Sequence, residues 1–298
     1  MTLRLDGRVA IVTGGGAGLG RAHALLLATQ GAKVVVNDLQ RPDGKSSAED
    51  VVAEIRQAGG EAIVAHGSVA EEAFAGSMVR QAVETFGRID ILVNNAGILR
   101  DKSFAKMAPA DFDLVLQVHL MGSLYCTRAA WPLMLAQKYG RIVFTTSVAG
   151  LAGGFGQSNY GTAKMGMLGL MNTLGLEGAK HNVFANAIMP AATTGMTAGI
   201  VAEQMAKLLK AELVSPAVAW LASERCTQSG LIISGGGGGF GRVQLVETRG
   251  VQFDPAEVVS VDVFDAALAE ITDMSTATPL QMGTYGRLDE RLKSRGLL

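Results

Sequence analysis

The chain has 298 residues, of which 48% are hydrophobic and 18% are charged, a composition that supports a large folded core and excludes a disordered protein. The formal net charge of -1 excludes strong electrostatic attraction to nucleic acid or to an anionic membrane surface. Cys126 and Cys226 are the only cysteines, too few for a disulfide framework or a metal cluster, and this usage favours a reducing compartment.

The two ends of the sequence carry no recognisable targeting signal. The N-terminal residues reach a charge at Arg4 before an apolar signal-peptide core can form. No run of about 18 uncharged apolar residues indicates a membrane span. The final residues, 296–298, differ from the usual peroxisomal tripeptide. We therefore expect a cytoplasmic protein.

Short, almost wholly apolar runs alternate with longer helical segments through about residue 235. We expect strands at residues 9–13, 33–37, 62–65, 89–93, 141–145, 183–188 and 231–233. Strands that are apolar on both faces belong to a parallel sheet covered by helices. The sequence therefore predicts an α/β fold with a doubly wound, Rossmann-like parallel sheet of seven strands.

The last third of the chain departs from this alternation. Residues 190–214 predict a mobile insertion at the ligand-holding edge of the sheet. The five glycines at 235–239 predict a flexible run of little structural strength. Residues 242–246 predict an extra strand, and 255–274 predict one helix with Asp254 as its N-cap.

A glycine-rich turn, residues 13–20, follows the first expected strand. Glycines there let the backbone approach a pyrophosphate closely, and the amides of the next helix can bind it. The residues expected to contact a nucleotide cofactor in this turn are Gly14, Gly18, Leu19 and Gly20. A tight turn without a ligand would look similar, but the preceding buried strand and Asp38 favour the nucleotide site.

Asp38 ends the second expected strand, about twenty residues after the turn. A carboxylate at this place accepts hydrogen bonds from the adenosine ribose and repels a 2′-phosphate, which predicts NAD rather than NADP. Arg41 lies close enough in sequence to weaken this preference. A solvated residue at the end of a strand is the alternative interpretation of Asp38.

Asn94, Asn95, Ala96 and Gly97 follow the fourth expected strand. Asparagine and glycine both favour ordinary turns. Their place at the carboxyl edge of a central strand nevertheless predicts that Asn95, Ala96 and Gly97 lie beside the cofactor, with Asn94 in a structural role and Gly97 leaving room on the adenosine side.

Ser147, Tyr160 and Lys164 form the expected catalytic group. A tyrosine and a lysine four residues apart share one helix face, where the ammonium stabilises a tyrosinate, and Ser147 supplies a hydroxyl from a strand end. Each residue alone has an ordinary alternative, a turn serine or a surface pair on a helix. Together with a nucleotide-binding turn, they predict hydride transfer at a carbon–oxygen bond.

These motifs, in this order, resemble the short-chain dehydrogenase/reductase family over about residues 5–240. The resemblance implies that Tyr160 is the general acid or base, helped by Lys164 because free tyrosine has a pKa near 10. It also implies that Lys164 holds the nicotinamide ribose, that Ser147 bonds the substrate oxygen and that the cofactor supplies the hydride chemistry. Residues 1–240 would then be the NAD-binding domain, and 241–298 an extension packed on it or on a partner subunit.

Two positions depart from the family pattern. His119 stands where many members carry an asparagine of a proton relay, so its ring or its carbonyl would serve the relay, or the ring is simply packed in a helix. Ser68, followed by Val69, stands where an aspartate often contacts adenine. Thr193 or Thr194 is expected to bond the nicotinamide carboxamide.

Several segments resemble a subgroup, the dehydrogenase domain of peroxisomal multifunctional β-oxidation proteins. They are residues 37–39, 95–104, 118–120, 127–131 and 154–160. The resemblance implies an NAD-dependent (3R)-3-hydroxyacyl-CoA dehydrogenase that forms 3-ketoacyl-CoA. The residues that would either line the acyl pocket or pack in the core are Met189, Met196, Ile200 and Met205.

Other functions stay open at this point. A 3-oxoacyl-carrier-protein reductase would normally prefer NADPH, which Asp38 disfavours, and a steroid or other secondary-alcohol dehydrogenase would use the same chemistry. A non-catalytic NAD-binding sensor or scaffold has no need of the complete catalytic group. We expect a small-molecule substrate, an acyl thioester, and a homodimer or homotetramer formed through helices around 111–136 and 158–180.

Overall fold

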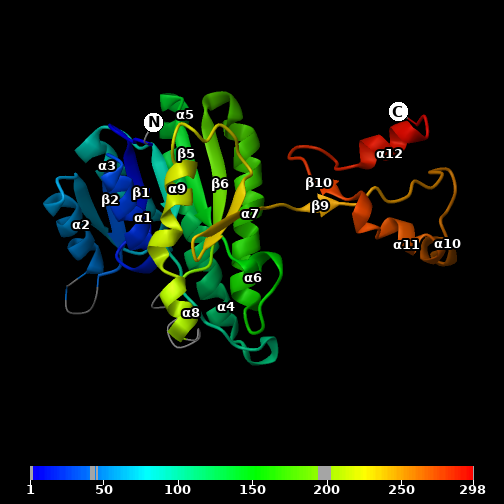
Figure 1. Cartoon of the computed structure of the whole chain (residues 1–298), viewed down its shortest axis with the longest axis horizontal. Coiled ribbons are helices and arrows are strands. Elements are labelled where there is room, and N and C mark those ends of the chain that lie inside the picture. The colour runs from blue at the N-terminus through cyan, green and yellow to red at the C-terminus, as the bar shows by residue number, and fades with distance from the viewer. Residues whose placement is uncertain (1–2, 41–43, 45, 194–202, 298) are drawn as a thin grey trace. The chain divides into compact units, whose positions relative to one another are not determined.

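The computed structural model describes residues 3–40, 44, 46–193 and 203–297. The chain divides into two compact units, Met1–Arg242 and Val243–Leu298 (Figure 1). Arg41, Thr194, Met196 and Ile200, which the sequence singled out, lie outside the described residues. Among the described helices, none combines the length and the apolar character that a membrane crossing requires.

The first unit contains one sheet of eight strands in the order β3-β2-β1-β4-β5-β6-β7-β8. The strands are β1 Val9–Val12, β2 Lys33–Asp38, β3 Ala62–His66, β4 Ile91–Asn94, β5 Gly140–Thr145, β6 Val183–Pro190, β7 Ile232–Gly236 and β8 Gly239–Val243. All pairs from β3 to β7 are parallel. The doubly wound fold is therefore confirmed, with one strand more than expected.

Helices cover both faces of this sheet (Figure 1). They are α1 Gly18–Thr29, α2 Ser47–Gln57, α3 Glu72–Phe86, α4 Pro109–Leu116, α5 Gly122–Gln137, α6 Val148–Leu151, α7 Ser158–Gly178, α8 Glu203–Leu208 and α9 Ser215–Leu221. Leu27, Ile55 and Val218 bring α1, α2 and α9 into one apolar cluster with the central strands. The central strands β1, β4 and β5 are buried throughout, as the uninterrupted apolar runs predicted.

The glycine run at 235–239, predicted as flexible and structurally weak, forms a hairpin turn together with the adjoining ends of two strands. Gly237 and Gly238, with φ of 58° and 83°, connect β7 to β8. A two-residue hairpin turn with positive φ at both central positions strongly favours glycine. The extra strand is accordingly β8, which ends at Val243, earlier than the predicted 242–246.

The second unit contains two very short strands and several short helices. They are β9 Val246–Glu247, paired antiparallel with β10 Thr278–Pro279, then α10 Val261–Ala266, α11 Leu268–Ile271 and α12 Leu288–Ser294. None of its described residues is buried. The small unit therefore lacks an apolar core of its own.

The single helix predicted over 255–274 was wrong, as was its cap. The chain forms α10 and α11 instead, and Ser260, rather than Asp254, caps α10 by accepting a hydrogen bond from the Val263 amide at 3.3 Å. Two β-branched residues, Val258 and Val259, precede this cap and have low helix propensity. The side chain of Asp254 accepts from the Ala256 amide in a separate turn.

Candidate active site

A pocket of about 320 Å³ lies where the strand order reverses between β1 and β4, at the carboxyl edge of the sheet. Ligands of doubly wound folds bind at this kind of crevice. The lining residues are Gly14, Ala17, Gly18, Leu19, Gly20, Asp38, Asn95, Ala96, Gly97, His119, Thr145, Thr146, Ser147, Tyr160, Lys164 and Pro190. Segments far apart in the sequence thus meet in one cavity.

The glycine turn has the close backbone packing that its sequence predicted. Gly14 has a φ of 62°, and a Cβ there would lie 2.9 Å from the Cα of Ala96. A Cβ on Gly20 would collide with the carbonyl of Gly14. Side chains at these two positions would therefore displace the turn from the adjoining loop.

The N-terminus of α1 opens toward this turn. The helix begins at Gly18, its N-cap residue Ala17 makes no side-chain hydrogen bond, and its first turn has no acidic residue. The first amides of an uncapped helix, together with the helix dipole, favour an anion such as a pyrophosphate. The turn and the helix start therefore form a suitable cradle for the phosphates of a dinucleotide.

Thr13 joins the glycine turn to the loop after β4. Its hydroxyl accepts hydrogen bonds from the amides of Asn95 and Ala96 at 3.0 and 3.1 Å and donates to the Val93 carbonyl at 3.3 Å. In the opposite direction, the Asn95 side chain donates hydrogen bonds to the carbonyls of Thr13 and Gly14. Asn95 thus lines the pocket and also holds its two walls together.

Asp38 lies at the end of β2 on the rim of the pocket. One carboxylate oxygen accepts from the Gly16 amide at 2.9 Å, and the other accepts from the Leu39 amide at 2.7 Å. These two bonds fix the carboxylate beside the glycine turn. Both interpretations of Asp38, a ligand of the ribose and a solvated residue at the end of a strand, fit this position, because the side chain ends β2 and is partly exposed.

Ser147, Tyr160 and Lys164 all face the same pocket. Ser147 follows β5 and caps α6, where its Oγ accepts from the Ala149 amide at 3.2 Å. Lys164 lies one turn after Tyr160 in α7, with its Nζ 5.3 Å from the centroid of the tyrosine ring. The Nζ also donates to the Thr145 carbonyl at 2.5 Å.

Burial dominates the protonation of these groups. It lowers the pKa of Lys164 to about 7, because a charged ammonium is poorly solvated in the pocket. Burial also raises the pKa of Tyr160, while its hydrogen bond with Ser147 lowers it and the nearby carboxylate of Asp101 raises it. The protein therefore holds a lysine and a tyrosine whose protonation responds strongly to whatever enters the pocket.

His119 lies in a π-helical turn, Gln117–Met121, between α4 and α5. Such turns often mark functional sites. Its Nε2 is 2.8 Å from the Ile98 carbonyl oxygen and 3.0 Å from the Ile98 amide nitrogen, and its ring packs edge-on against Tyr160 with 5.2 Å between centroids. A Cβ on Gly97 would collide with this ring, so Gly97 makes room for the histidine.

The His119 ring is neutral near physiological pH. Burial, followed by the charge of Lys164, lowers its pKa to about 3, against the smaller opposite effect of the Ile98 hydrogen bond. Its Nδ1 is buried and has no hydrogen-bond partner in the described structure. A buried polar atom in a pocket wall is commonly satisfied by water or a ligand, so both expectations for the ring, packing and a relay, fit its position.

Three predicted cofactor residues lie outside the pocket lining. Ser68 accepts from the Ala70 amide, and the side chain of Val69 packs where a Cβ on Gly122 would go. Thr193 donates its amide to the Leu209 carbonyl, and its hydroxyl has no partner in the described structure. Of the expected acyl-pocket residues, Met205 is 50% exposed, so it is not part of the core.

The sequence reasoning missed Thr145, which lines the pocket with a buried hydroxyl that has no partner in the described structure. The signal was available, because Thr145 precedes Ser147 by two residues and side chains at this spacing share one face of a strand. Thr146, Pro190 and Ala17 also line the pocket. Thr146 donates to the carbonyl of Lys164 at 3.0 Å and so attaches α7 to the end of β5.

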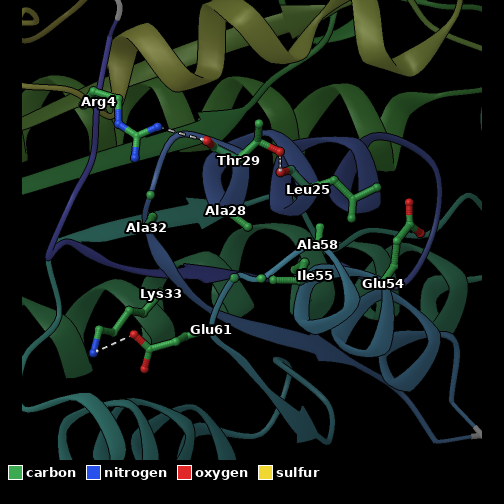
Figure 2. A pocket seen from close by; sticks show the side chains of 13 residues that line it. Arg4, Leu25, Ala28, Thr29, Ala32, Lys33, Glu54, Ile55, Ala58 and Glu61 are labelled. Carbon is green, nitrogen blue, oxygen red and sulfur yellow. Dashed lines mark hydrogen bonds and ion pairs between the residues drawn. The ribbon is translucent and has the colours of Figure 1, made fainter.

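A second hollow, of about 470 Å³, lies at the opposite edge of the sheet. Figure 2 shows its walls, formed by the ends of α1 and α2 and the start of β2. Lys33 and Glu61 form an ion pair there at 3.0 Å, and Arg4 donates to the Thr29 carbonyl at 3.4 Å. The other two charged side chains of its lining also have partners, since Arg4 pairs with Asp6 and Glu54 pairs with Arg21.

Comparison with known proteins agrees with this geometry. The chain is 46% identical over 306 residues to the peroxisomal multifunctional enzyme type 2 of Drosophila melanogaster, covering 99% of this chain and 51% of that protein. The structure of that full-length enzyme superposes with a TM-score of 0.83 at 41% identity, covering 98% of this chain and 50% of the other. The chain thus spans about half the length of this relative.

Two further relatives are closer in length to this chain. A short-chain type dehydrogenase/reductase of Mycobacterium tuberculosis is 48% identical over 275 residues, which cover 91% of this chain and 96% of the relative. The 3-oxoacyl-[acyl-carrier-protein] reductase of Synechocystis is 43% identical over 208 residues, covering 70% and 80%. The model of the short chain dehydrogenase family matches residues 8–205. The chain therefore belongs to the short-chain dehydrogenase family.

Proposed function

We propose that this protein is an NAD-dependent oxidoreductase that interconverts (3R)-3-hydroxyacyl-CoA and 3-ketoacyl-CoA. The observation that carries the proposal is the meeting of Ser147, Tyr160 and Lys164 in one pocket with the glycine turn and Asp38. A cofactor cradle, an acid–base group and a hydroxyl that can hold a carbonyl oxygen are the parts that this reaction needs.

The pocket fits a dinucleotide at both ends. The uncapped start of α1 would hold the pyrophosphate, Asp38 the adenosine ribose, and Lys164 the nicotinamide ribose. The buried hydroxyl of Thr145 and the Nδ1 of His119 would gain partners from a bound ligand or its water. When bound, NAD supplies the hydride acceptor for the oxidation.

The chain itself handles the proton and the substrate oxygen. In oxidation, deprotonated Tyr160 takes the proton of the substrate hydroxyl while Ser147 donates a hydrogen bond to the same oxygen. Protonated Lys164 stabilises the tyrosinate. Because burial brings the lysine pKa to about 7, contact with cofactor hydroxyls that accept hydrogen bonds would favour its charged form.

The choice of NAD rests on Asp38. Its carboxylate, fixed by the amides of Gly16 and Leu39, places negative charge where an NADP 2′-phosphate would approach. A carboxylate held by two backbone amides cannot easily turn away. The structure therefore supports exclusion of the phosphate by charge repulsion.

The choice of substrate rests on the relatives. The Drosophila protein is named a multifunctional enzyme of peroxisomes, and the active-site segments of this chain resemble the dehydrogenase domain of such proteins. The decisive test measures NADH formation with (3R)- and (3S)-3-hydroxyacyl-CoA, each offered NAD and NADP. We expect turnover with the 3R isomer and NAD. If the enzyme oxidises only simple secondary alcohols, the alcohol–ketone reaction is retained and hydroxyacyl-CoA is excluded as its substrate.

A second candidate is 3-oxoacyl-carrier-protein reduction, which the Synechocystis relative favours. It would consume NADPH and a ketoacyl carrier protein. Offering acetoacetyl-carrier protein and acetoacetyl-CoA with NADH and NADPH separates the two candidates. A preference for the carrier protein with NADPH would replace our first proposal.

We also propose that residues 243–298 pack on the first unit or on a partner subunit of a homodimer or homotetramer. The support is the absence of buried residues among those described in this unit, together with exposed apolar side chains such as Val258 and Val261. Light scattering of the full chain and of a variant ending at residue 242 tests this. Cytoplasmic location stays a prediction, tested by imaging a fluorescent fusion, because several relatives are named as peroxisomal.

A further inference from the structure

The loop after β4 runs alongside the residues that immediately precede Tyr160. Lys102 donates its amide to the Gly156 carbonyl at 2.9 Å. The neighbouring carboxylate of Asp101 accepts a hydrogen bond from Nε2 of Gln157 at 2.7 Å. A backbone bond and a charge-assisted bond thus join the loop to the start of α7.

A third connection joins Arg100 to Asn159, the residue immediately before Tyr160. Asn159 is completely buried and donates from Nδ2 to the Arg100 carbonyl at 3.1 Å. Its Oδ1 accepts from the backbone amide of Tyr160 at 2.7 Å. Three consecutive loop residues are therefore bonded to residues 156–159 at the start of α7, and Asn159 in turn bonds the backbone amide of the tyrosine.

We propose that Asp101 is a positioning residue for the reaction of Tyr160, acting through its bond to Gln157 and through its negative charge. The proposal rests on the proposed function, in which Tyr160 is the acid–base group. It adds to the catalytic group a residue that does not line the pocket and that the family motifs quoted above do not assign.

The surroundings leave the charge of Asp101 without a cationic partner in the described structure. Its neighbours Arg100 and Lys102 both form ion pairs with Asp111. The Arg100 Nε lies 3.9 Å from Oδ1 of Asp111, and the Lys102 Nζ lies 3.2 Å from Oδ2. The partner of Asp101 is the neutral amide of Gln157. The carboxylate is exposed, so solvent screens its charge, but no described ion pair neutralises it.

Several groups influence the tyrosine from different elements. Burial raises the pKa of Tyr160 and Asp101 raises it further, while the hydroxyl of Ser147 lowers it. Lys164 approaches from its own helix, and neutral His119 from the π-helical turn. Asp101 is therefore the negative charge that opposes formation of the tyrosinate.

Asp101→Asn tests the charge while keeping an oxygen that can accept the bond from Gln157. Oxidation needs deprotonated Tyr160, so we expect the acid limb of kcat against pH to move to lower pH, with the plateau changed less than about two-fold. Asp101→Glu should restore the wild-type limb. The matched control is Asp113→Asn, an exposed carboxylate of α4, which should leave the profile unchanged.

Asp101→Ala tests the position of the tyrosine because it removes both the bond and the charge. We expect the plateau kcat to fall by roughly ten-fold with little change in the KM for NAD, since small displacements of an acid–base group are costly. Gln157→Leu should reproduce the loss of kcat without the shift of the limb. Circular dichroism gives the folded fraction of each variant, and a fall in kcat no larger than the fall in that fraction would indicate a purely structural role and overturn the proposal.

A titration without substrate separates this proposal from the proposed function. Near-ultraviolet absorbance reports phenolate formation, and subtracting the curve of Tyr160→Phe isolates one of the four tyrosines. The Asp101→Asn background should show Tyr160 ionising at lower pH. If no hydroxyacyl-CoA is turned over but this shift is present, the function fails and the charge effect stands; an unchanged curve overturns the charge effect.

Discussion

The two hollows at opposite edges of the same sheet differ in whether the polar groups of their linings have partners. The hollow at the amino edge is the larger, about 470 Å³ against about 320 Å³, but each of its charged side chains has an ion-pair partner, as Lys33 has in Glu61. The pocket at the carboxyl edge contains buried polar atoms without partners on His119 and Thr145. Of these two hollows, the carboxyl pocket is therefore the one whose described lining has buried polar groups that a ligand or water could satisfy.

The largest effect expected from this difference is loss of activity in the carboxyl pocket. Tyr160→Phe removes the acid–base group but keeps the ring that packs against His119, so turnover should fall roughly 1,000-fold. NAD affinity, measured by fluorescence titration, should stay within about three-fold of wild type. Nearly unchanged turnover would show that the pocket does not work through its tyrosine.

Lys164 should make the stability of the protein depend on pH. Its pKa falls from 10.5 to about 7 on folding, so between these values the unfolded chain binds a proton that the folded protein lacks. The free energy of unfolding should therefore rise as pH increases from about 7 to about 10. Lys164→Met should remove this rise and stabilise the protein near pH 7 by ~4 kcal/mol. Urea unfolding at several pH values measures both effects.

Asp38 should change the cofactor preference by a smaller amount. Asp38→Asn weakens the bonds to ribose and removes the charge that repels a phosphate, so the ratio of kcat/KM for NAD to that for NADP should fall roughly 10- to 100-fold. Asp50→Asn, an exposed carboxylate on α2, is the control. An equal fall in the control would assign the preference to overall charge.

The smallest effect is expected at the amino edge. Lys33→Ala breaks an ion pair whose side chains are 33% and 60% exposed, so the free energy of unfolding should change by only about 0.5 kcal/mol. Steady-state kinetics should be those of the wild type. A clear kinetic defect would contradict the distinction between the two hollows.

Local sequence patterns predicted most of the fold and the centre of the site. Apolar runs mark buried parallel strands because both faces of such strands are covered, and the four-residue spacing of Tyr160 and Lys164 places both on one helix face. Asp38 was recognisable because the distance from the glycine turn to the end of the second strand is nearly constant in such folds.

The features that the sequence did not predict depend on contacts between distant segments. The Gly237–Gly238 hairpin reads as a flexible run unless the flanking residues are known to be strands. The bond of Asp101 to Gln157 joins two loops 56 residues apart. The π-helical turn of His119 has no periodic signal of its own. The helix predicted over 255–274 begins later because Ser260 caps it there, and it is interrupted at Ala267.

The hydroxyl of Thr13 has a mechanical consequence. It accepts from two amides of the loop after β4, while Asn95 returns two bonds to the turn after β1. β1 and β4 belong to opposite halves of the doubly wound sheet, so these bonds connect the two halves at the point where the strand order reverses. Neither loop at the base of the crevice can therefore move without breaking hydrogen bonds to the other, whatever ligand enters.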